Sequence, residues 1–222
     1  VIAMDLRGHG DSDKSGSYTM TQLVADLRAL VDHFDLLCPV LIGHSLGGHI
    51  AAKFAAIYPD EVQQLVLIDG MGPPQEHHLK TTEDRLRQWQ RHISEALQMG
   101  RQPRLMKGEH EAVQRLTKNN PRLSLETARF IVKHGVLAHP DGGICWKWDP
   151  GVNMVWGTFS HEESEQLYTL IQCRVQLITG EHSMDYWAQN RIELSGKYDL
   201  HDRDIERRRQ LFPQAEHVVI KD

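Results

Sequence analysis

The feature that most constrains this chain is the decapeptide PVLIGHSLGG at residues 39–48. Its first four residues are apolar and predict a buried strand, and LGGHIAAKFAAI after Ser45 predicts a helix that Tyr58-Pro59 stops. A Gly-x-Ser-x-Gly pentad between a strand and a helix is typical of a sharp, strained turn that holds its serine at the carboxyl end of a sheet. Gly43 and Gly47 have no Cβ to collide with neighbouring backbone. The pentad therefore predicts Ser45 as a nucleophile.

The helix that begins after Ser45 also predicts how a reaction intermediate is stabilised. Backbone N–H groups at a helix N-terminus point toward bound anions. We expect the Leu46 N–H to donate to an oxyanion formed on the substrate. His44, on the other side of Ser45, is expected to contact the substrate.

Strand-like and helical segments alternate around this turn, which predicts an α/β fold. Residues 1–4 form a strand-like apolar run, residues 17–34 carry apolar side chains at helical spacing, and residues 65–68 predict a further strand. Two more strands are expected, at residues 175–179 and 217–220. Single helices between strands predict a parallel sheet with right-handed crossovers.

From about residue 75 to residue 170 the sequence predicts helices and few strands. Ser124 and Ser160 are placed to cap two of these helices. Because the insertion follows a strand that ends at Asp69, we expect it to be a cap over the active-site face. The expected division is an α/β core in residues 1–72 and 173–222, with a helical cap in residues 73–172.

Composition and charge exclude several function classes. A net charge of −5, with scattered Lys and Arg, gives no basis for nucleic-acid binding. No apolar run approaches the ~20 residues of a membrane span, and the 14 histidines show no metal-ligand spacing, so neither a membrane span nor a metal is expected. Three widely spaced cysteines fit a reducing compartment better than a disulfide framework, and the predicted location is cytoplasmic.

Five segments together resemble the α/β-hydrolase superfamily, in its capped branch of small hydrolases. They are DLRGHGDSD after the first apolar run, GHSLGG at the turn, LVLIDG, the helical insertion, and VQLITGE near the end. The resemblance covers nearly the whole chain. It implies a parallel sheet of eight strands flanked by helices, a serine-acid-histidine triad, and no metal or organic cofactor.

The same resemblance implies that the chain is a fragment. Val1 corresponds to the start of the family's fourth strand and His217 to the start of its eighth. The first three strands, the second oxyanion donor and the triad histidine after the eighth strand are then expected outside this chain. His217 would lie at the opposite end of the sheet from Ser45, and His182 is a weak substitute. We expect the chain by itself to be inactive.

Three carboxylates are candidates for the acid of the triad. The family usually places this acid in a Gly-x-x-Asp pattern after its seventh strand, but here the pattern from Gly180 is Gly-Glu-His-Ser, with Ser183 at the expected position. Asp185, two residues further on, is the preferred candidate. Some family members carry the acid after the sixth strand, which corresponds to Asp69, and Glu181 is the third candidate.

The resemblance favours a serine hydrolase that cleaves a small-molecule ester or related acyl substrate through an acyl-enzyme on Ser45. Relatives that act on epoxides or haloalkanes carry aspartate at this position. Trp146 and Trp148 are expected either to line an apolar substrate pocket or to form the core of the cap. C–C bond hydrolysis and acyl transfer by the same nucleophile stay open, as does a non-catalytic ligand-binding or interaction protein. The sequence does not determine the oligomeric state.

Overall fold

The computed structural model describes residues 1–72, 82–97, 103–183 and 198–221. The chain forms two compact units. Unit 1 comprises Val1–Thr19 and Gln88–Thr158, and unit 2 comprises Met20–Arg87 and Phe159–Asp222. The helix α3 (Thr82–Ala96) contains a boundary between them. The division into a catalytic core and a cap stays a prediction.

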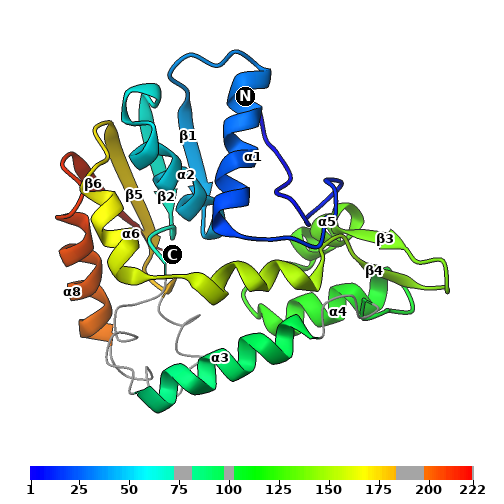
Figure 1. Ribbon diagram of the computed structural model, residues 1–222. Helices are drawn as coiled ribbons and strands as arrows, with labels where there is room; N and C mark the ends of the chain where they lie inside the picture. Colours follow the sequence, from blue (N-terminus) through cyan, green and yellow to red (C-terminus); the bar gives the residue numbers. More distant parts are fainter. Residues whose placement is uncertain (73–81, 98–102, 184–197, 222) are drawn as a thin grey trace. The chain divides into compact units, whose positions relative to one another are not determined.

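Unit 2 contains a four-stranded sheet in the order β1-β2-β5-β6 (Figure 1). Its strands are β1 (Val40–His44), β2 (Gln64–Ile68), β5 (Arg174–Gly180) and β6 (Ala215–Ile220). All three strand pairings are parallel, which confirms the predicted α/β fold. His44 is in register with Ile68, and Ile68 with Ile178, so the carboxyl ends of β1, β2 and β5 lie beside one another at the same end of the sheet.

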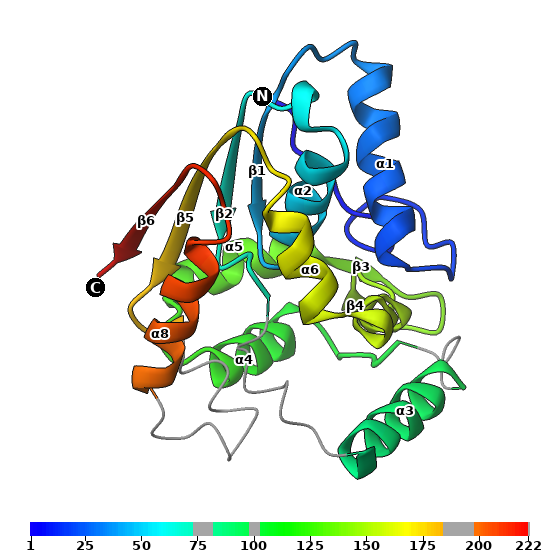
Figure 2. The same ribbon diagram turned by 60° about the vertical axis from the view of Figure 1, so that its left-hand side comes forward.

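In the described part of unit 2, besides the first residues of α3, four helices accompany the sheet. They are α1 (Met20–His33), α2 (Leu46–Ile57), α6 (His161–Tyr168) and α8 (Tyr198–Arg209), and the 3₁₀ turn η1 (Pro59–Glu61) ends the segment after α2. α2 packs against β1 and β2 and contacts both α1 and α6, and Figure 2 shows α2, α6 and α8 on the same face of the sheet. The predicted helices after Ser45 and within residues 17–34 are thus confirmed.

Two expectations about strands are wrong. Val40 and Ile42 are 46% and 68% exposed, so β1 is not buried. Val40 and Ile42 are two residues apart and therefore share one face of β1, and their exposure shows that the described residues leave this face largely uncovered. Residues 1–4 are described but form no strand, because no other described segment supplies a hydrogen-bonding partner along them.

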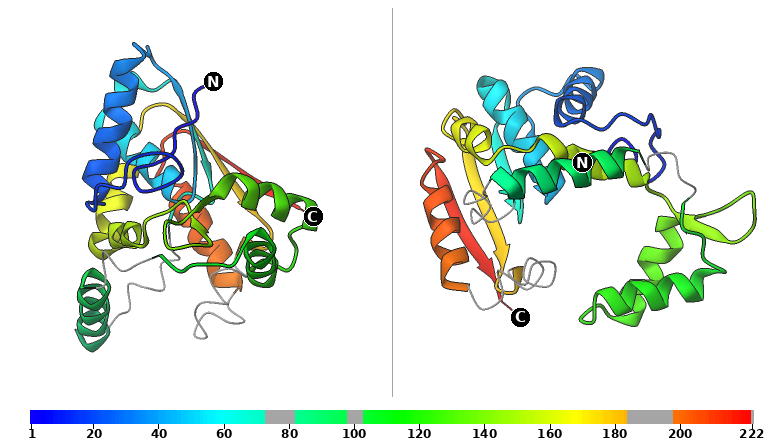
Figure 3. Two further views of the ribbon diagram at one scale, coloured as in Figure 1. Left: turned by 90° about the vertical axis from the view of Figure 1, so that its right-hand side faces the viewer. Right: turned by 60° about the horizontal axis from the view of Figure 1, so that its bottom comes forward.

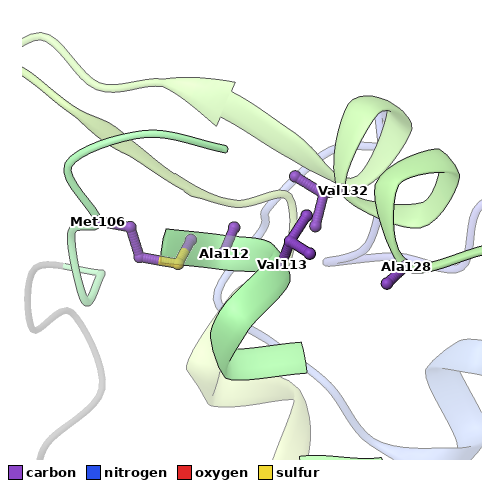
Figure 4. Packing of buried hydrophobic residues seen from close by; sticks show 5 residues of the cluster. All are labelled: Met106, Ala112, Val113, Ala128 and Val132. Atoms are coloured by element: carbon purple, nitrogen blue, oxygen red, sulfur yellow. The ribbon is translucent and has the colours of Figure 1, made fainter. Parts of the chain in front are cut away.

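In its described residues, unit 1 combines two helices and the larger part of α3 with a hairpin. Its elements are α4 (Glu109–Asn119), α5 (Leu125–Gly135), β3 (Val136–Ala138), β4 (Ile144–Trp146) and the 3₁₀ segment η3 (Pro150–Thr158). Figure 3 shows α4 and α5 side by side, with the antiparallel hairpin β3–β4 continuing from α5. Among the described residues of this unit, five buried residues form one hydrophobic core cluster (Figure 4), namely Met106, Ala112, Val113, Ala128 and Val132.

The two predicted helix caps are confirmed. The Ser124 hydroxyl accepts from the Thr127 N–H at 3.1 Å, and the Ser160 hydroxyl accepts from the Glu163 N–H at 3.2 Å. Each bond satisfies a first-turn donor that has no acceptor within the helix. None of the described helices is long and apolar enough to cross a membrane.

The glycine-rich loop DLRGHGDSD in unit 1 is held by its own polar groups. The Asp5 carboxylate accepts from the Asp11 N–H at 2.9 Å, and the Asp5 carbonyl accepts from the Ser12 hydroxyl at 2.7 Å. Gly8 has a φ of 79°, and a Cβ at this position would lie 2.5 Å from the ring of Tyr18. The side chains of Asp5 and Ser12 therefore have a structural role in ordering the loop.

Candidate active site

Ser45 forms the turn between β1 and α2 in a conformation that L-amino acids rarely adopt, with φ 49° and ψ −116°. Such backbone strain costs about 1–3 kcal/mol and persists only where the surrounding structure imposes it. The Ser45 N–H donates to the Ile68 carbonyl of β2 at 2.9 Å. The Ser45 carbonyl accepts from the N–H groups of Gly48 and His49 at 2.9 and 3.2 Å. These bonds hold the serine between the end of the sheet and the start of α2.

Two glycines allow backbone segments to approach closely around this turn. A Cβ on Gly43 would lie 2.3 Å from the Gly47 carbonyl oxygen, and a Cβ on Gly48 would lie 2.6 Å from the Gly70 Cα. At Gly47, an added Cβ would meet none of the described atoms outside its own helix within 4 Å. The expectation that Gly47 avoids a backbone collision is therefore wrong, and Gly48 has that role.

The Ser45 side chain is exposed, and within the described part of the chain it makes no capping bond to α2. Leu46 is the first residue of α2, so its N–H is one of the first-turn donors that lack an intrahelical acceptor. A hydroxyl oxygen and an N–H donor therefore lie on adjacent residues at a helix N-terminus, where the helix dipole favours negative charge. His44 is the exposed last residue of β1, and its contact with substrate stays a prediction.

Asp69 and Ser183 connect the ends of β2 and β5. The Ser183 hydroxyl donates to Asp69 Oδ1 at 2.8 Å and accepts from the Gly180 N–H at 3.0 Å. The Asp69 N–H donates to the Ile178 carbonyl at 2.8 Å, and Asp69 itself has a φ of 45°. In the sequence, Ser183 is visible only as a replacement for an expected aspartate, and its bond to Asp69 emerges only from the fold.

The other two candidate acids have no comparable position beside the strand of Ser45 in the described structure. Asp185 lies outside the described residues. Glu181 follows β5, one strand further from β1 than Asp69, and its Oε1 lies 3.6 Å from His182 Nε2. Among the described candidates, Asp69 therefore follows the strand that pairs directly with the strand of Ser45.

A buried polar cluster holds the chain just after Asp69. Arg208 is 2% exposed, and its guanidinium donates to the Met71 carbonyl at 2.7 Å and to the Asp204 carboxylate at 2.6 Å. The Tyr168 hydroxyl donates to the same carbonyl at 3.1 Å, and burial raises the pKa of Tyr168 to about 12, so this donor keeps its proton. The sequence gives no sign of this role, because Arg208 lies within a run of three arginines that is typical of a solvated helix face.

His49 lies on α2, one turn after Ser45, and is 2% exposed. Burial, reinforced by the positive charges of Arg208 and Lys53, lowers the pKa of His49 to about 3. Its ring packs edge-on against Phe159, with the ring centroids 5.1 Å apart. At neutral pH His49 is therefore an uncharged part of the packing behind the turn.

His217 lies within β6 rather than at its start, because the strand begins at Ala215. Its strand partner is Leu177, and its Nε2 shares a hydrogen bond of 2.9 Å with Thr179 Oγ1. The expectation that His217 begins the last strand is therefore wrong by two residues.

The expectation that His217 lies at the opposite end of the sheet from Ser45 is also wrong. Its strand partner Leu177 is in register with Leu67, and Leu67 is in register with Gly43. The triad histidine stays a prediction.

The described residues contain no cluster of His, Cys, Asp or Glu that could hold a metal ion.

The two tryptophans predicted to contact substrate belong to unit 1. Trp146 is the last residue of β4 and packs against the hydrophobic cluster of this unit. Trp148 is 38% exposed, and its backbone forms an isolated antiparallel β-bridge with His9. Both line a pocket of unit 1, together with Lys147 and His134 among other residues. Trp146 is thus part of the core of unit 1, and a substrate-binding role for either ring stays a prediction.

Comparisons with known proteins agree with this architecture. A family model described as "alpha/beta hydrolase fold" matches residues 1–134. A "Serine hydrolase-like protein" of Danio rerio is 31% identical over 162 residues, which cover 69% of this chain and 48% of that protein. The "Epoxide hydrolase 4" of Mus musculus is 40% identical over 72 residues, 31% of this chain and 20% of that protein. The chain thus matches about half the length of the first relative and a fifth of the second.

Solved structures share the fold at low sequence identity. A thioesterase domain from the curacin biosynthetic pathway is 20% identical, with a TM-score of 0.73 over 98% of this chain and 73% of that chain. An esterase of Mycobacterium tuberculosis is 19% identical, with a TM-score of 0.69 over 98% of this chain and 67% of that chain. With a family match over more than half of its length and a parallel sheet that leads into a strained serine turn, the chain belongs to the α/β-hydrolase fold family.

Proposed function

We propose that the protein is a serine hydrolase that cleaves an ester or related acyl substrate through an acyl-enzyme on Ser45. The observation that carries this proposal is the strained backbone of Ser45 at an exposed turn directly before α2. A serine that served only as a helix cap would have an extended conformation, and its side chain would bond to a first-turn N–H. Ser124 and Ser160 behave in this way, whereas Ser45 does not.

In this mechanism, Ser45 Oγ attacks the acyl carbonyl carbon while a histidine takes the hydroxyl proton. The carbonyl oxygen becomes an oxyanion, to which the Leu46 N–H donates. The intermediate collapses when the histidine returns the proton to the leaving group, and water then hydrolyses the acyl-enzyme. A carboxylate orients the imidazole and stabilises its charged form, and the candidates for this role are Asp69, Asp185 and Glu181.

The residue type at position 45 favours acyl substrates over epoxides. A carboxylate that opens an epoxide forms an ester, which water can cleave at the carbonyl, whereas a serine would form an unreactive ether. Similarity to the mouse protein named epoxide hydrolase 4 therefore supports the fold but not an epoxide substrate. Esters, thioesters and activated C–C bonds next to a carbonyl all lead to the same acyl-serine.

A fluorophosphonate probe tests this proposal on the protein expressed from its complete gene. We expect covalent labelling of Ser45, located by mass spectrometry, and hydrolysis of p-nitrophenyl acetate. Ser45→Ala should remove both, and Ser94→Ala, at an exposed serine on α3, should retain both. A folded protein that neither reacts with the probe nor hydrolyses the ester would contradict the proposal and favour a non-catalytic binding role.

A further inference from the structure

We propose that Asp69 is the acid of the triad and that Ser183 is its positioning residue, an inference that rests on the proposed function of Ser45. By resemblance to the family, the acid is expected as the fourth residue of a Gly-x-x-Asp pattern that begins at Gly180. This chain has Ser183 at that position. The Ser183 hydroxyl donates to Asp69 Oδ1 at 2.8 Å. The residue at the usual acid position is thus bonded to a carboxylate at the end of the neighbouring strand.

A second hydrogen bond sets the direction of the first. Ser183 Oγ accepts from the Gly180 N–H at 3.0 Å, and a hydroxyl has a single proton to donate. An ionised carboxylate can only accept, so the Ser183 proton points to Asp69 Oδ1. Hydrogen bonds to charged groups are stronger than those between neutral groups. Ser183 therefore restricts rotation of the Asp69 carboxylate.

The backbone around both residues is anchored to the sheet. The Asp69 N–H donates to the Ile178 carbonyl at 2.8 Å, and the Glu181 N–H donates to the Ile220 carbonyl at 2.9 Å. Two residues after Asp69, the buried guanidinium of Arg208 holds the Met71 carbonyl at 2.7 Å. The carboxylate thus projects from a segment that is held on both sides, as the orienting group of a triad requires.

The second oxygen of the Asp69 carboxylate accepts no hydrogen bond from the described residues. Asp69 is exposed, and among the described residues its carboxylate bonds to Ser183 alone, through Oδ1. Asp69 is also next to the nucleophile in the sheet, because the Ile68 carbonyl that accepts from the Ser45 N–H belongs to the peptide bond between Ile68 and Asp69. An imidazole N–H bonded to Oδ2 would be held at the end of the strand beside β1, where Ser45 lies.

The test uses four variants of the protein expressed from its complete gene: Asp69→Asn, Asp185→Asn, Ser183→Ala and Ser183→Thr. For each we measure kcat and KM for p-nitrophenyl acetate, the rate of fluorophosphonate labelling at Ser45, and the melting temperature. Asp69→Asn should lower kcat by up to ~10⁴-fold, on the order of a hundredfold more than Asp185→Asn. Ser183→Ala should lower kcat about tenfold at unchanged KM, because a bond to a charged group is lost. Ser183→Thr keeps the hydroxyl and should restore most of kcat.

Each contrary outcome identifies what fails. A larger loss in Asp185→Asn than in Asp69→Asn overturns the assignment of the acid, while labelling of wild-type Ser45 leaves the proposed function standing. Wild-type kcat in Ser183→Ala, or equal losses in the alanine and threonine variants, overturns the positioning role. A wild-type protein that is not labelled at Ser45 overturns both proposals. If Asp69→Asn melts early, the Ser183 pair and Asp185→Asn decide the assignment.

Discussion

The backbone N–H of Ser45 donates to the Ile68 carbonyl at 2.9 Å, which joins the serine turn to the end of the adjacent strand. Asp69 follows Ile68 directly after the strand ends, so the proposed nucleophile and the proposed acid are linked through one hydrogen bond and one peptide unit. Both residues have positive φ, at 49° and 45°. The two residues on which the proposed chemistry depends therefore both have strained backbone, and they directly follow the neighbouring strands β1 and β2.

The glycines of the turn should differ in their tolerance of alanine. Gly43→Ala and Gly48→Ala should each destabilise the protein by about 1–3 kcal/mol or more, because the added Cβ meets backbone that cannot move aside. Gly47→Ala is the matched control, since its Cβ enters open space and alanine favours the helix by up to about 1 kcal/mol. The free energy of unfolding in urea measures all three. Equal destabilisation at the three positions would contradict the geometry.

His49 should make stability depend on pH. The pKa of the folded His49 is about 3, below that of an exposed histidine, so the unfolded state binds more protons between about pH 6.5 and pH 3. Stability should therefore be complete above about pH 6.5 and should fall, by at most about 1.4 kcal/mol per pH unit, as the pH decreases. The groups that act on His49 besides burial are Arg208, Lys53 and His161.

Urea unfolding of wild type and of His49→Leu at pH 7 and pH 5 measures this contribution. The wild-type loss between the two pH values should exceed that of His49→Leu. His110→Leu, at an exposed histidine on α4, should keep the wild-type pH dependence. Identical pH dependence in wild type and His49→Leu would show that the buried ring does not titrate in this way.

Arg208 should contribute far more to stability than its neighbour Arg209. Arg208→Met removes one of the two donors to the Met71 carbonyl and leaves the buried Asp204 carboxylate with Arg207 as its ion-pair partner, at a cost of about 3 kcal/mol. Arg209 pairs with Glu206 at the surface, so Arg209→Met should change the free energy of unfolding much less. Comparable losses in the two variants, measured by urea unfolding, would contradict the buried role of Arg208.

The small core of unit 1 should be sensitive to truncation at Met106. This side chain is 2% exposed and belongs to the cluster shown in Figure 4, so Met106→Ala should cost about 2–5 kcal/mol. Leu105→Ala is the adjacent control, because Leu105 is 37% exposed and should lose much less. Thermal unfolding followed by tryptophan fluorescence reports on this unit, which contains Trp146 and Trp148. A melting temperature unchanged by Met106→Ala would be inconsistent with its burial.

Local patterns in the sequence determined the elements of the fold. The apolar run before Ser45, the helix after it and the caps at Ser124 and Ser160 were predictable, because each depends on residues only a few positions apart. The alternation of strands and helices likewise predicted a parallel sheet. The strained turn at Ser45 was predictable for the same reason, since its motif is contained within five residues.

Strand order and register decided the rest. Ser183 and Asp69 are 114 positions apart and meet because β5 lies beside β2, a neighbour relation that no local pattern encodes. The same holds for Gly48, whose close contact is Gly70, and for Arg208, which reaches Met71 from a helix that looks solvated in the sequence. The exposure of Val40 and Ile42 likewise depends on which face of β1 other segments cover. The local sequence thus determined that a strained turn presents a serine, whereas long-range packing decided which other residues lie around that turn.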